Sequence, residues 1–344
     1  MSVEIIPFGN TLDGREVHKI IIKNTRLEAE LMTLGCTILS LRVPNKMGEL
    51  VDVVLGFNEA SDYEKNDGYL GMIVGRYANR IAGAKFWLDG VSYQLEKNEG
   101  ENQLHGGTGG MTFKVYEVKQ IDENTVEFYQ SASDGENGFP GKLNVKVTYT
   151  LSEEGLAIRY RAETDRPTVC NFTNHSYFNL NGQGDGMSQS LWIDADDFTP
   201  INAECIPVAY KTQVEGTPFD FRKEKKLAAD IDTPCEQLKL GFGYDHNFVF
   251  TSKPGIRLAA KLRGDKSGIL METWTNKPGM QLYTANHLNS SVGTKNGSTY
   301  KRRGAVCLET QFPPNSPNNQ EWCPVVLRPG HEYDYTTEYR FYTE

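Results

Sequence analysis

The chain has 344 residues, with 36 Lys or Arg against 45 Asp or Glu, which gives a formal net charge of −9. A chain of this length buries enough apolar surface to fold without disulfides or metal ions. Nucleic-acid binding rests on basic patches that neutralise phosphates, and the two densest basic runs, residues 223–226 and 301–303, are short. Composition therefore argues against a nucleic-acid partner.

Six cysteines are spread along the chain without a C-x-x-C pair. The opening residues carry neither the basic nor the apolar region of a secretory signal. No apolar run approaches the roughly 20 residues needed to span a bilayer. We therefore expect free thiols in a cytoplasmic protein that does not insert into membranes.

The first regular elements predicted along the chain are a short helix at residues 60–64 and a hairpin centred on Asp89-Gly90. An Asp-Gly pair supplies the positive φ angles that a tight hairpin turn requires. Phe86 and Leu88 precede this turn and alternate with polar residues, as a strand with one buried face would.

Apolar and polar residues alternate again over residues 143–151 and 156–162, on either side of a Ser-Glu-Glu-Gly turn. This pattern predicts a second hairpin with one buried face. A second short helix is expected at residues 223–230, and alternation returns over residues 333–341.

Long helical periodicities are scarce, and no internal repeat, low-complexity tract or linker interrupts the chain. Many strands, few short helices and steady turn signals are typical of an all-β fold built as a large antiparallel sandwich or barrel. We expect one domain over residues 1–344.

Six polar or glycine-rich segments interrupt the strand pattern. They are Gly-Arg-Tyr-Ala-Asn-Arg (75–80), Asn-Gln-Leu-His-Gly-Gly-Thr-Gly-Gly (102–110), Asn-His-Ser-Tyr-Phe-Asn-Leu (174–180), Gly-Tyr-Asp-His-Asn (243–247), Trp274 with Pro-Gly-Met-Gln (278–281), and Leu-Glu-Thr-Gln-Phe-Pro-Pro (308–314).

The glycines after His105 lack the Lys-Ser/Thr of a phosphate-binding P-loop and the third glycine of a dinucleotide fingerprint. We expect them to allow positive φ or a close approach of backbone to a ligand. Four histidines fall in or near the segments, at 105, 175, 246 and 287, but without the short spacing of metal ligands, so no metal site is predicted.

Glu309 is the most informative single residue, because it follows the apolar run Ala-Val-Cys-Leu on a strand that Pro313 soon ends. A carboxylate on a buried strand needs partners, and a catalytic site can provide them. His175 is similar, since it lies in polar sequence where a strand should turn. His246 and His287 are expected to be ordinary hydrogen-bonding or surface residues, and the segment around Asp245 is also compatible with a simple turn.

Taken in order, the six segments closely resemble the aldose 1-epimerase (galactose mutarotase) family. The resemblance rests on Gly-Arg-x-x-Asn-Arg, Asn-x-Leu-His-Gly-Gly, Asn-His-x-Tyr-Phe-Asn-Leu, Asp-His-Asn-Phe, Pro-Gly-x-Gln-x-Tyr-Thr and Leu-Glu-Thr-Gln, and it covers about residues 5–342. It implies a single-domain β-supersandwich that interconverts the α and β anomers of free hexoses, galactose or glucose, with no cofactor, as a monomer or homodimer.

The resemblance also implies residue roles. His175 is expected to be the general acid on the ring oxygen of the sugar, and Glu309 the general base on its C1 hydroxyl. A cationic His175 would then hold Glu309 ionised. The substrate contacts implied by the resemblance are Asn79, Arg80, His105, Asp245 and Gln281; Trp274 is expected to offer an apolar face.

Three alternatives remain open from the sequence. A glycosidase would use two carboxylates, for which Glu309 and Asp245 are candidates. A non-catalytic sugar-binding module would not require both His175 and Glu309. An enzyme for phosphorylated hexoses would need extra cations, for which Arg80 and Arg76 are candidates.

Overall fold

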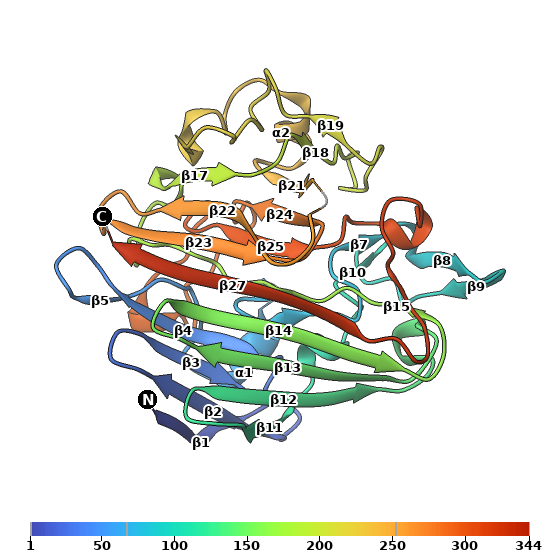
Figure 1. Cartoon of the computed structure of the whole chain (residues 1–344), viewed down its shortest axis with the longest axis horizontal. Coiled ribbons are helices and arrows are strands. Elements are labelled where there is room, and N and C mark those ends of the chain that lie inside the picture. Colours follow the sequence, from blue (N-terminus) through green and yellow to red (C-terminus); the bar gives the residue numbers. More distant parts are fainter. Residues whose placement is uncertain (1, 67, 252, 344) are drawn as a thin grey trace.

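The computed structural model describes residues 2–66, 68–251 and 253–343 (Figure 1). Strands far outnumber helices within these ranges, and the only α-helices there are α1 (Ala60–Lys65) and α2 (Glu236–Leu240). None of the helices described is long and apolar enough to cross a membrane. All six cysteines have free thiols. The expected all-β class with few short helices is confirmed.

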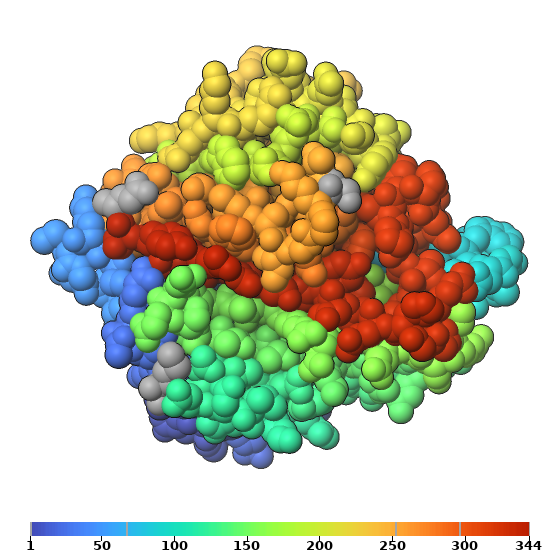
Figure 2. Space-filling view, in the orientation of Figure 1, coloured from blue at the N-terminus to red at the C-terminus, as the bar shows by residue number. Residues whose placement is uncertain are grey.

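The largest layer is an antiparallel sheet of nine strands in the order β11-β12-β13-β14-β27-β23-β22-β17-β20. The C-terminal strand β27, red in Figure 1, lies in its middle, between β14 and β23. On the molecular surface it forms a red band between green and orange regions (Figure 2). The strands are β11 (Glu117–Gln120), β12 (Thr125–Ala132), β13 (Leu143–Leu151), β14 (Gly155–Thr164), β17 (Ser190–Ile193), β20 (Lys225–Lys226), β22 (Arg257–Arg263), β23 (Ile269–Thr275) and β27 (Tyr333–Thr343).

A second antiparallel sheet, in the order β1-β2-β3-β4-β5, shares one hydrophobic cluster with the nine-stranded sheet. Every second residue of β13, including Val147 and Tyr149, is buried, because side chains alternate between the two faces of a strand. These residues cluster with Ile20 and Leu31 of the second sheet. Its strands are β1 (Ser2–Asn10), β2 (Glu16–Lys23), β3 (Glu28–Met32), β4 (Thr37–Pro44) and β5 (Leu50–Asp52).

A third antiparallel sheet, in the order β19-β18-β21-β24-β25, holds three of the six polar segments. Its strands are β18 (Asp197–Phe198), β19 (Thr212–Gln213), β21 (Asp245–Val249), β24 (Gly279–Tyr283) and β25 (Cys307–Gln311). Every residue of β25 is buried, which confirms the buried strand expected around Glu309.

Short two-stranded sheets bring the other three polar segments together. The pairs are β6 (Ile73–Val74) with β16 (Thr173–Asn174), β7 (Arg80–Ile81) with β10 (Gln103–Leu104), β8 (Lys85–Leu88) with β9 (Val91–Gln94), and β15 (Thr168–Val169) with β26 (Val326–Leu327). Single turns of 3₁₀ helix are η1 (Ala82–Ala84), η2 (Met111–Phe113), η3 (Glu136–Gly138), η4 (Gly186–Ser188), η5 (Leu227–Ala229), η6 (Lys295–Gly297) and η7 (Ser316–Asn318).

Both predicted hairpins and the helix at residues 60–64 are confirmed. Asp89 and Gly90 have φ angles of 50° and 78°, as the tight turn requires. The helix predicted at residues 223–230 is wrong. That segment forms β20, paired with β17, followed by η5, and the ammonium of Lys225 is held by the Asp230 carboxylate at 2.6 Å. Pairing with a neighbouring strand overrides the weak local helical pattern.

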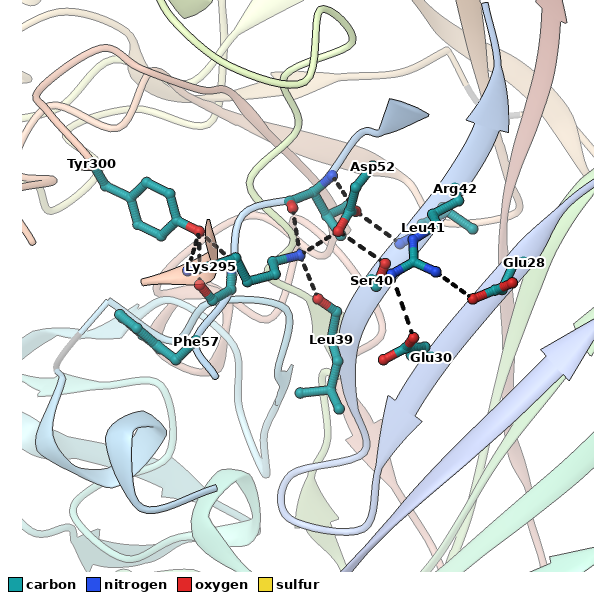
Figure 3. Close-up of polar contacts among 12 residues, drawn as sticks. Glu28, Glu30, Leu39, Ser40, Leu41, Arg42, Asp52, Phe57, Lys295 and Tyr300 are labelled. Atoms are coloured by element: carbon teal, nitrogen blue, oxygen red, sulfur yellow. Dashed lines mark hydrogen bonds and ion pairs between the residues drawn. The ribbon is translucent and has the colours of Figure 1, made fainter. Parts of the chain in front are cut away.

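Residues 285–304, here called the pocket-wall segment, are held against the second sheet by one partly buried cation, Lys295. The ammonium of Lys295 donates to the carbonyl oxygens of Leu39 (2.6 Å) and Val54 (2.8 Å) and to the carboxylate of Asp52 (2.7 Å) (Figure 3). The Tyr300 hydroxyl donates to the carbonyl of Gly56 at 2.7 Å. A segment with little regular structure is thereby given a defined position.

Candidate active site

A cavity of about 290 Å³ is lined by residues from β21, β24 and β25 and from the loops before β6, after β10 and after β16. Seven residues are predicted from the sequence to form the site, and six of them line this cavity. They are Asn79, Arg80, His105, His175, Asp245 and Glu309. Folding thus brings together polar segments that are up to 230 residues apart, from Asn79 to Glu309.

One face of the third sheet carries the acidic side of the site. Across neighbouring strands Gln281 pairs with Glu309, and Tyr283 pairs both with Asp245 and with Cys307. Because strand side chains alternate and directly paired residues share a face, these five side chains lie on the same face of the sheet.

His175 follows β16 and is fixed through its backbone. Its N–H donates to the Met72 carbonyl at 2.9 Å, and its carbonyl accepts from the Gly71 N–H at 3.0 Å. Its Nε2 lies 3.6 Å from Oε1 of Glu309. The ring of Tyr177 stacks on the imidazole, with centroids 5.1 Å apart and planes inclined by 28°. The imidazole and the carboxyl therefore face one another in a fixed orientation.

Glu309 is 2% exposed, and its Oε2 has no hydrogen-bond partner among the described residues. Burial raises the pKa of this carboxyl well above its usual value; the nearby Asp245 raises it further, whereas Arg80 opposes the shift. Burial likewise raises the pKa of Asp245. A buried carboxyl at the wall of a cavity, with a raised pKa and one oxygen that lacks a partner among the described residues, is suited to proton transfer.

The histidine opposite is not the cation that the sequence predicts. Burial lowers the pKa of His175 to about 4, opposed by a hydrogen bond to its own backbone carbonyl. Desolvation penalises imidazolium and carboxylate alike, so burial favours a neutral pair with one transferable proton, on Glu309. The expectation that a cationic His175 holds Glu309 ionised is therefore corrected.

His105 presents a fixed hydrogen-bond donor to the cavity. Its Nδ1 accepts the backbone N–H of Asn79 at 3.1 Å, and burial lowers its pKa well below the usual value. The neutral ring must therefore carry its proton on Nε2. The glycine after it, Gly106, has φ 86°, and an added Cβ there would lie 2.4 Å from the carbonyl oxygen of Gly75. The positive φ is what the glycine cluster was expected to permit, and the close neighbour is the backbone of Gly75.

His105, His175 and Glu309 offer ligand atoms that all lie within 4.8 Å of one another, a set that can hold a transition-metal ion. A metal on His105 would have to displace either the Asn79 N–H from Nδ1 or the proton from Nε2. The donor set is therefore better suited to hydrogen bonding than to metal binding.

Asn79 and Arg80 lie where the chain enters β7. Asn79 has a left-handed φ of 66°, and its side-chain oxygen accepts the N–H of Arg80 at 2.9 Å. The Arg80 guanidinium donates to both oxygens of Glu99, at 2.6 and 2.7 Å. Such a bidentate pair fixes the plane of the guanidinium at the edge of the cavity.

Gln281 is the one predicted contact that does not line the cavity. Its amide donates to Oδ1 of Asp245 at 2.6 Å, and its oxygen accepts from Gln311 at 3.4 Å. The structure thus places Gln281 behind Asp245, where it orients that carboxyl.

The structure corrects the expectation for Trp274 and removes Arg76 as a candidate cation of the site. Trp274 lies on β23 against Arg340, whose guanidinium is 4.5 Å from the ring centroid, and it does not line the cavity. Arg76 is buried elsewhere and donates to the carbonyls of Pro140 and Gly141, both at 2.9 Å. Neither residue is placed to contact a sugar.

The remaining two histidines lie in different environments. His246 is fully buried, accepts the Asp245 N–H at 3.1 Å and contacts Gln237 at 3.3 Å, as expected of an ordinary hydrogen-bonding residue. His287, expected to be unremarkable, is exposed and lies at the cavity lining.

Sequence reasoning missed several lining residues. The aromatic walls are Tyr69, Tyr177 and Tyr283 rather than Trp274. Tyr177 belongs to the Asn-His-x-Tyr motif, so the sequence could have predicted it as a lining residue. Glu99 could not be predicted in this way, because it lies in the charged stretch 96–101, a pattern typical of exposed surface.

Comparison with known proteins identifies the family. The aldose 1-epimerase family profile matches residues 18–340. A galactose mutarotase of Bos taurus is 40% identical over 344 residues, covering 99% of each chain. An aldose 1-epimerase of Escherichia coli K12 is 36% identical over 338 residues, covering 96% of this chain and 97% of the other.

Solved structures agree. An aldose epimerase homologue of C. elegans superimposes with a TM-score of 0.88 at 32% identity, covering 94% of this chain and 98% of the other. A galactose 1-epimerase of Lactobacillus acidophilus gives 0.88 at 27% identity, covering 100% and 99%. The fold and the full-length similarity agree with the resemblance found in the motifs, and the chain belongs to the aldose 1-epimerase family of isomerases.

Proposed function

We propose that this protein interconverts the α and β anomers of free galactose and glucose, with His175 as general acid and Glu309 as general base. The observation that carries the proposal is the buried pair itself: His175 Nε2 and Glu309 Oε1 are 3.6 Å apart at the wall of a polar cavity. Nothing in this chemistry consumes a cofactor.

Anomer exchange opens the hemiacetal ring, rotates the aldehyde and closes the ring on the other face. Opening removes the proton of the C1 hydroxyl and adds one to the ring oxygen. In the neutral pair the transferable proton lies on Glu309, and it first passes to Nε2 of His175. The Glu309 carboxylate then takes the proton of the C1 hydroxyl while Nε2 gives its proton to the ring oxygen. Closure reverses the transfers, so the pair returns to its starting state.

The rest of the cavity supports sugar binding. His105 offers a fixed N–H, the Asp245 carboxyl accepts, and the Arg80 guanidinium and Asn79 lie at the edge. Tyrosine rings provide apolar faces for C–H groups of a pyranose.

Two of the alternatives lose support. A phosphosugar enzyme would need free cations in the cavity, but Arg80 is already neutralised by Glu99 and Arg76 lies elsewhere. A glycosidase would use Asp245 and Glu309 as its two carboxyl groups. In this structure the Asp245 carboxyl accepts a hydrogen bond from Gln281, and the partner of Glu309 is His175. Release of nitrophenol from a nitrophenyl galactoside would favour the glycosidase.

The proposal is tested by polarimetry on freshly dissolved α-D-galactose and α-D-glucose. We expect wild-type protein to speed relaxation to the same final rotation. Glu309→Gln and His175→Asn should each lower kcat by at least about a hundredfold, as loss of a general acid or base does. A folded Glu309→Gln variant with wild-type kcat would remove Glu309 from the role of base.

We further propose that the protein works in the cytoplasm as a monomer or homodimer. The six free thiols fit a reducing compartment. Size-exclusion chromatography with light scattering measures the assembly, and a tetramer would contradict this part of the proposal.

A further inference from the structure

Cys307 contacts the edge of the His175 imidazole at Nδ1, the nitrogen that the reaction does not use. Its Sγ lies 3.6 Å from Nδ1, while Nε2 of the same ring lies 3.6 Å from Glu309 Oε1. Cys307 and Glu309 are two residues apart on β25, so their side chains share a face about 7 Å apart. The imidazole spans this interval, with one nitrogen at each side chain.

The position of the single proton on the neutral ring follows from these contacts. A proton on Nδ1 can be donated to the backbone carbonyl of His175 and to the sulfur of Cys307. The Nε2 lone pair then faces the Glu309 carboxyl, which burial favours in its protonated form. With the proton on Nε2 instead, the Nδ1 lone pair would face that carbonyl oxygen, which is repulsive.

The thiol is a suitable partner for a ring that changes charge. Burial raises the pKa of Cys307 well above its usual value, so the group remains a neutral thiol and not a thiolate. A neutral sulfur accepts weakly, so it orients Nδ1–H without trapping the ring as an imidazolium.

We propose that Cys307 is a positioning residue whose sulfur accepts the Nδ1–H of His175, so that Nε2 alone exchanges a proton with Glu309 and the sugar. The inference rests on the proposed function and deepens it. The two histidines of the cavity are thereby held in opposite tautomers: His105 carries its proton on Nε2 and is a fixed donor, whereas His175 carries it on Nδ1 and can accept or give at Nε2.

The tautomers are read directly by ¹⁵N NMR of protein labelled at histidine, at pH 7. Spectra of His175→Asn and His105→Asn assign the two rings. In wild type we expect the protonated nitrogen of His175 to be Nδ1 and that of His105 to be Nε2. A His175 ring protonated on Nε2 would overturn the proposal, whatever the activity.

Kinetics of three variants test the role in catalysis. Cys307→Val removes the acceptor at similar volume, and we expect a mixture of His175 tautomers and a kcat about tenfold lower with KM unchanged, as for loss of one hydrogen bond. Cys307→Ser restores an acceptor and should recover most of kcat. Cys170→Val removes another buried thiol, one outside the cavity, and should leave kcat unchanged.

The outcomes separate this inference from the proposed function. Cys307→Val that keeps both the wild-type tautomer and the wild-type kcat overturns the role of Cys307. Wild type protonated on Nδ1, with a mixture of tautomers in Cys307→Val but without mutarotation of either sugar, keeps the hydrogen bond and overturns the proposed function. Circular dichroism of each variant establishes that it is folded.

Discussion

Arg80 is the only arginine that lines the cavity within the described chain, and its charge is already paired. Glu99 receives two guanidinium hydrogen bonds, and the Arg80 side chain is only 13% exposed. A pair this shielded is worth more than an exposed ion pair, because both geometry and desolvation hold it. Glu99 therefore fixes the Arg80 guanidinium at the cavity and directs its remaining N–H groups.

We expect Glu99→Gln to raise KM for galactose about tenfold with a smaller change in kcat, because it loosens a binding group without touching the acid and base. Steady-state polarimetry measures both constants. Glu101→Gln is the matched control, since Glu101 is exposed and pairs only with Lys97 among the described residues. A fall in kcat with KM unchanged would show that Glu99 acts on the reaction step instead.

At the scale of elements, the pocket-wall segment joins the cavity to the second sheet. Its residues Leu288, Asn289 and Ser290 line the cavity, and a few residues later Lys295 is pinned to β4 and to Asp52. The burial of an ammonium costs free energy unless its three donors are satisfied, and here all three find oxygen acceptors. The segment is thus held by polar contacts instead of by a strand ladder.

We expect Lys295→Met to lower the free energy of unfolding by about 2–3 kcal/mol, because the Asp52 carboxylate and two carbonyls lose their donor. Urea unfolding followed by circular dichroism measures the change. Lys301→Met, an exposed position in the same segment, should change stability by less than about 0.5 kcal/mol. KM should also rise in Lys295→Met, and an unaltered stability and KM together would contradict the anchoring role.

At the scale of the whole molecule, the two ends of the chain contribute unequally to the sheets and the core. β27 is the last strand in sequence but pairs along its length with β14 and with β23, so it joins the two halves of the nine-stranded sheet (Figure 1). Tyr339 and Phe341 on this strand are 1% exposed. β1, in contrast, is an edge strand whose only partner among the described strands is β2, and none of its residues 2–10 is buried.

We expect a chain ending at residue 332 to lack cooperative unfolding. Without β27, the paired edges of β14 and β23 and the core beneath them are exposed. Removal of residues 2–10 should lower the melting temperature but leave a cooperative transition and measurable mutarotation. Differential scanning calorimetry compares the two truncations. A cooperative transition in the chain ending at 332 would contradict the central role of β27.

Sequence reasoning succeeded where local pattern and final environment agree. The alternation over residues 143–151 matches burial residue by residue, and the Asp89-Gly90 turn has the expected backbone angles. It failed for residues 223–230, where pairing of β20 with β17 outweighs local propensity. The prediction that Trp274 faces the sugar was wrong for a related reason. Motif order gives the position of a residue along the chain, but the sheet determines which face its side chain occupies.

By itself, the sequence determined the all-β class, the family and six of the residues that line the cavity, because strand periodicity and motif order are properties of the chain. The tertiary structure alone decided which groups meet and in which direction burial shifts their pKa values. Burial of Glu309 and His175 favours a neutral pair in place of an ion pair. Gln281 donates a hydrogen bond to Asp245, and Glu99 accepts two from Arg80. Desolvation and cross-strand contact depend on three-dimensional neighbours, and no one-dimensional pattern contains them.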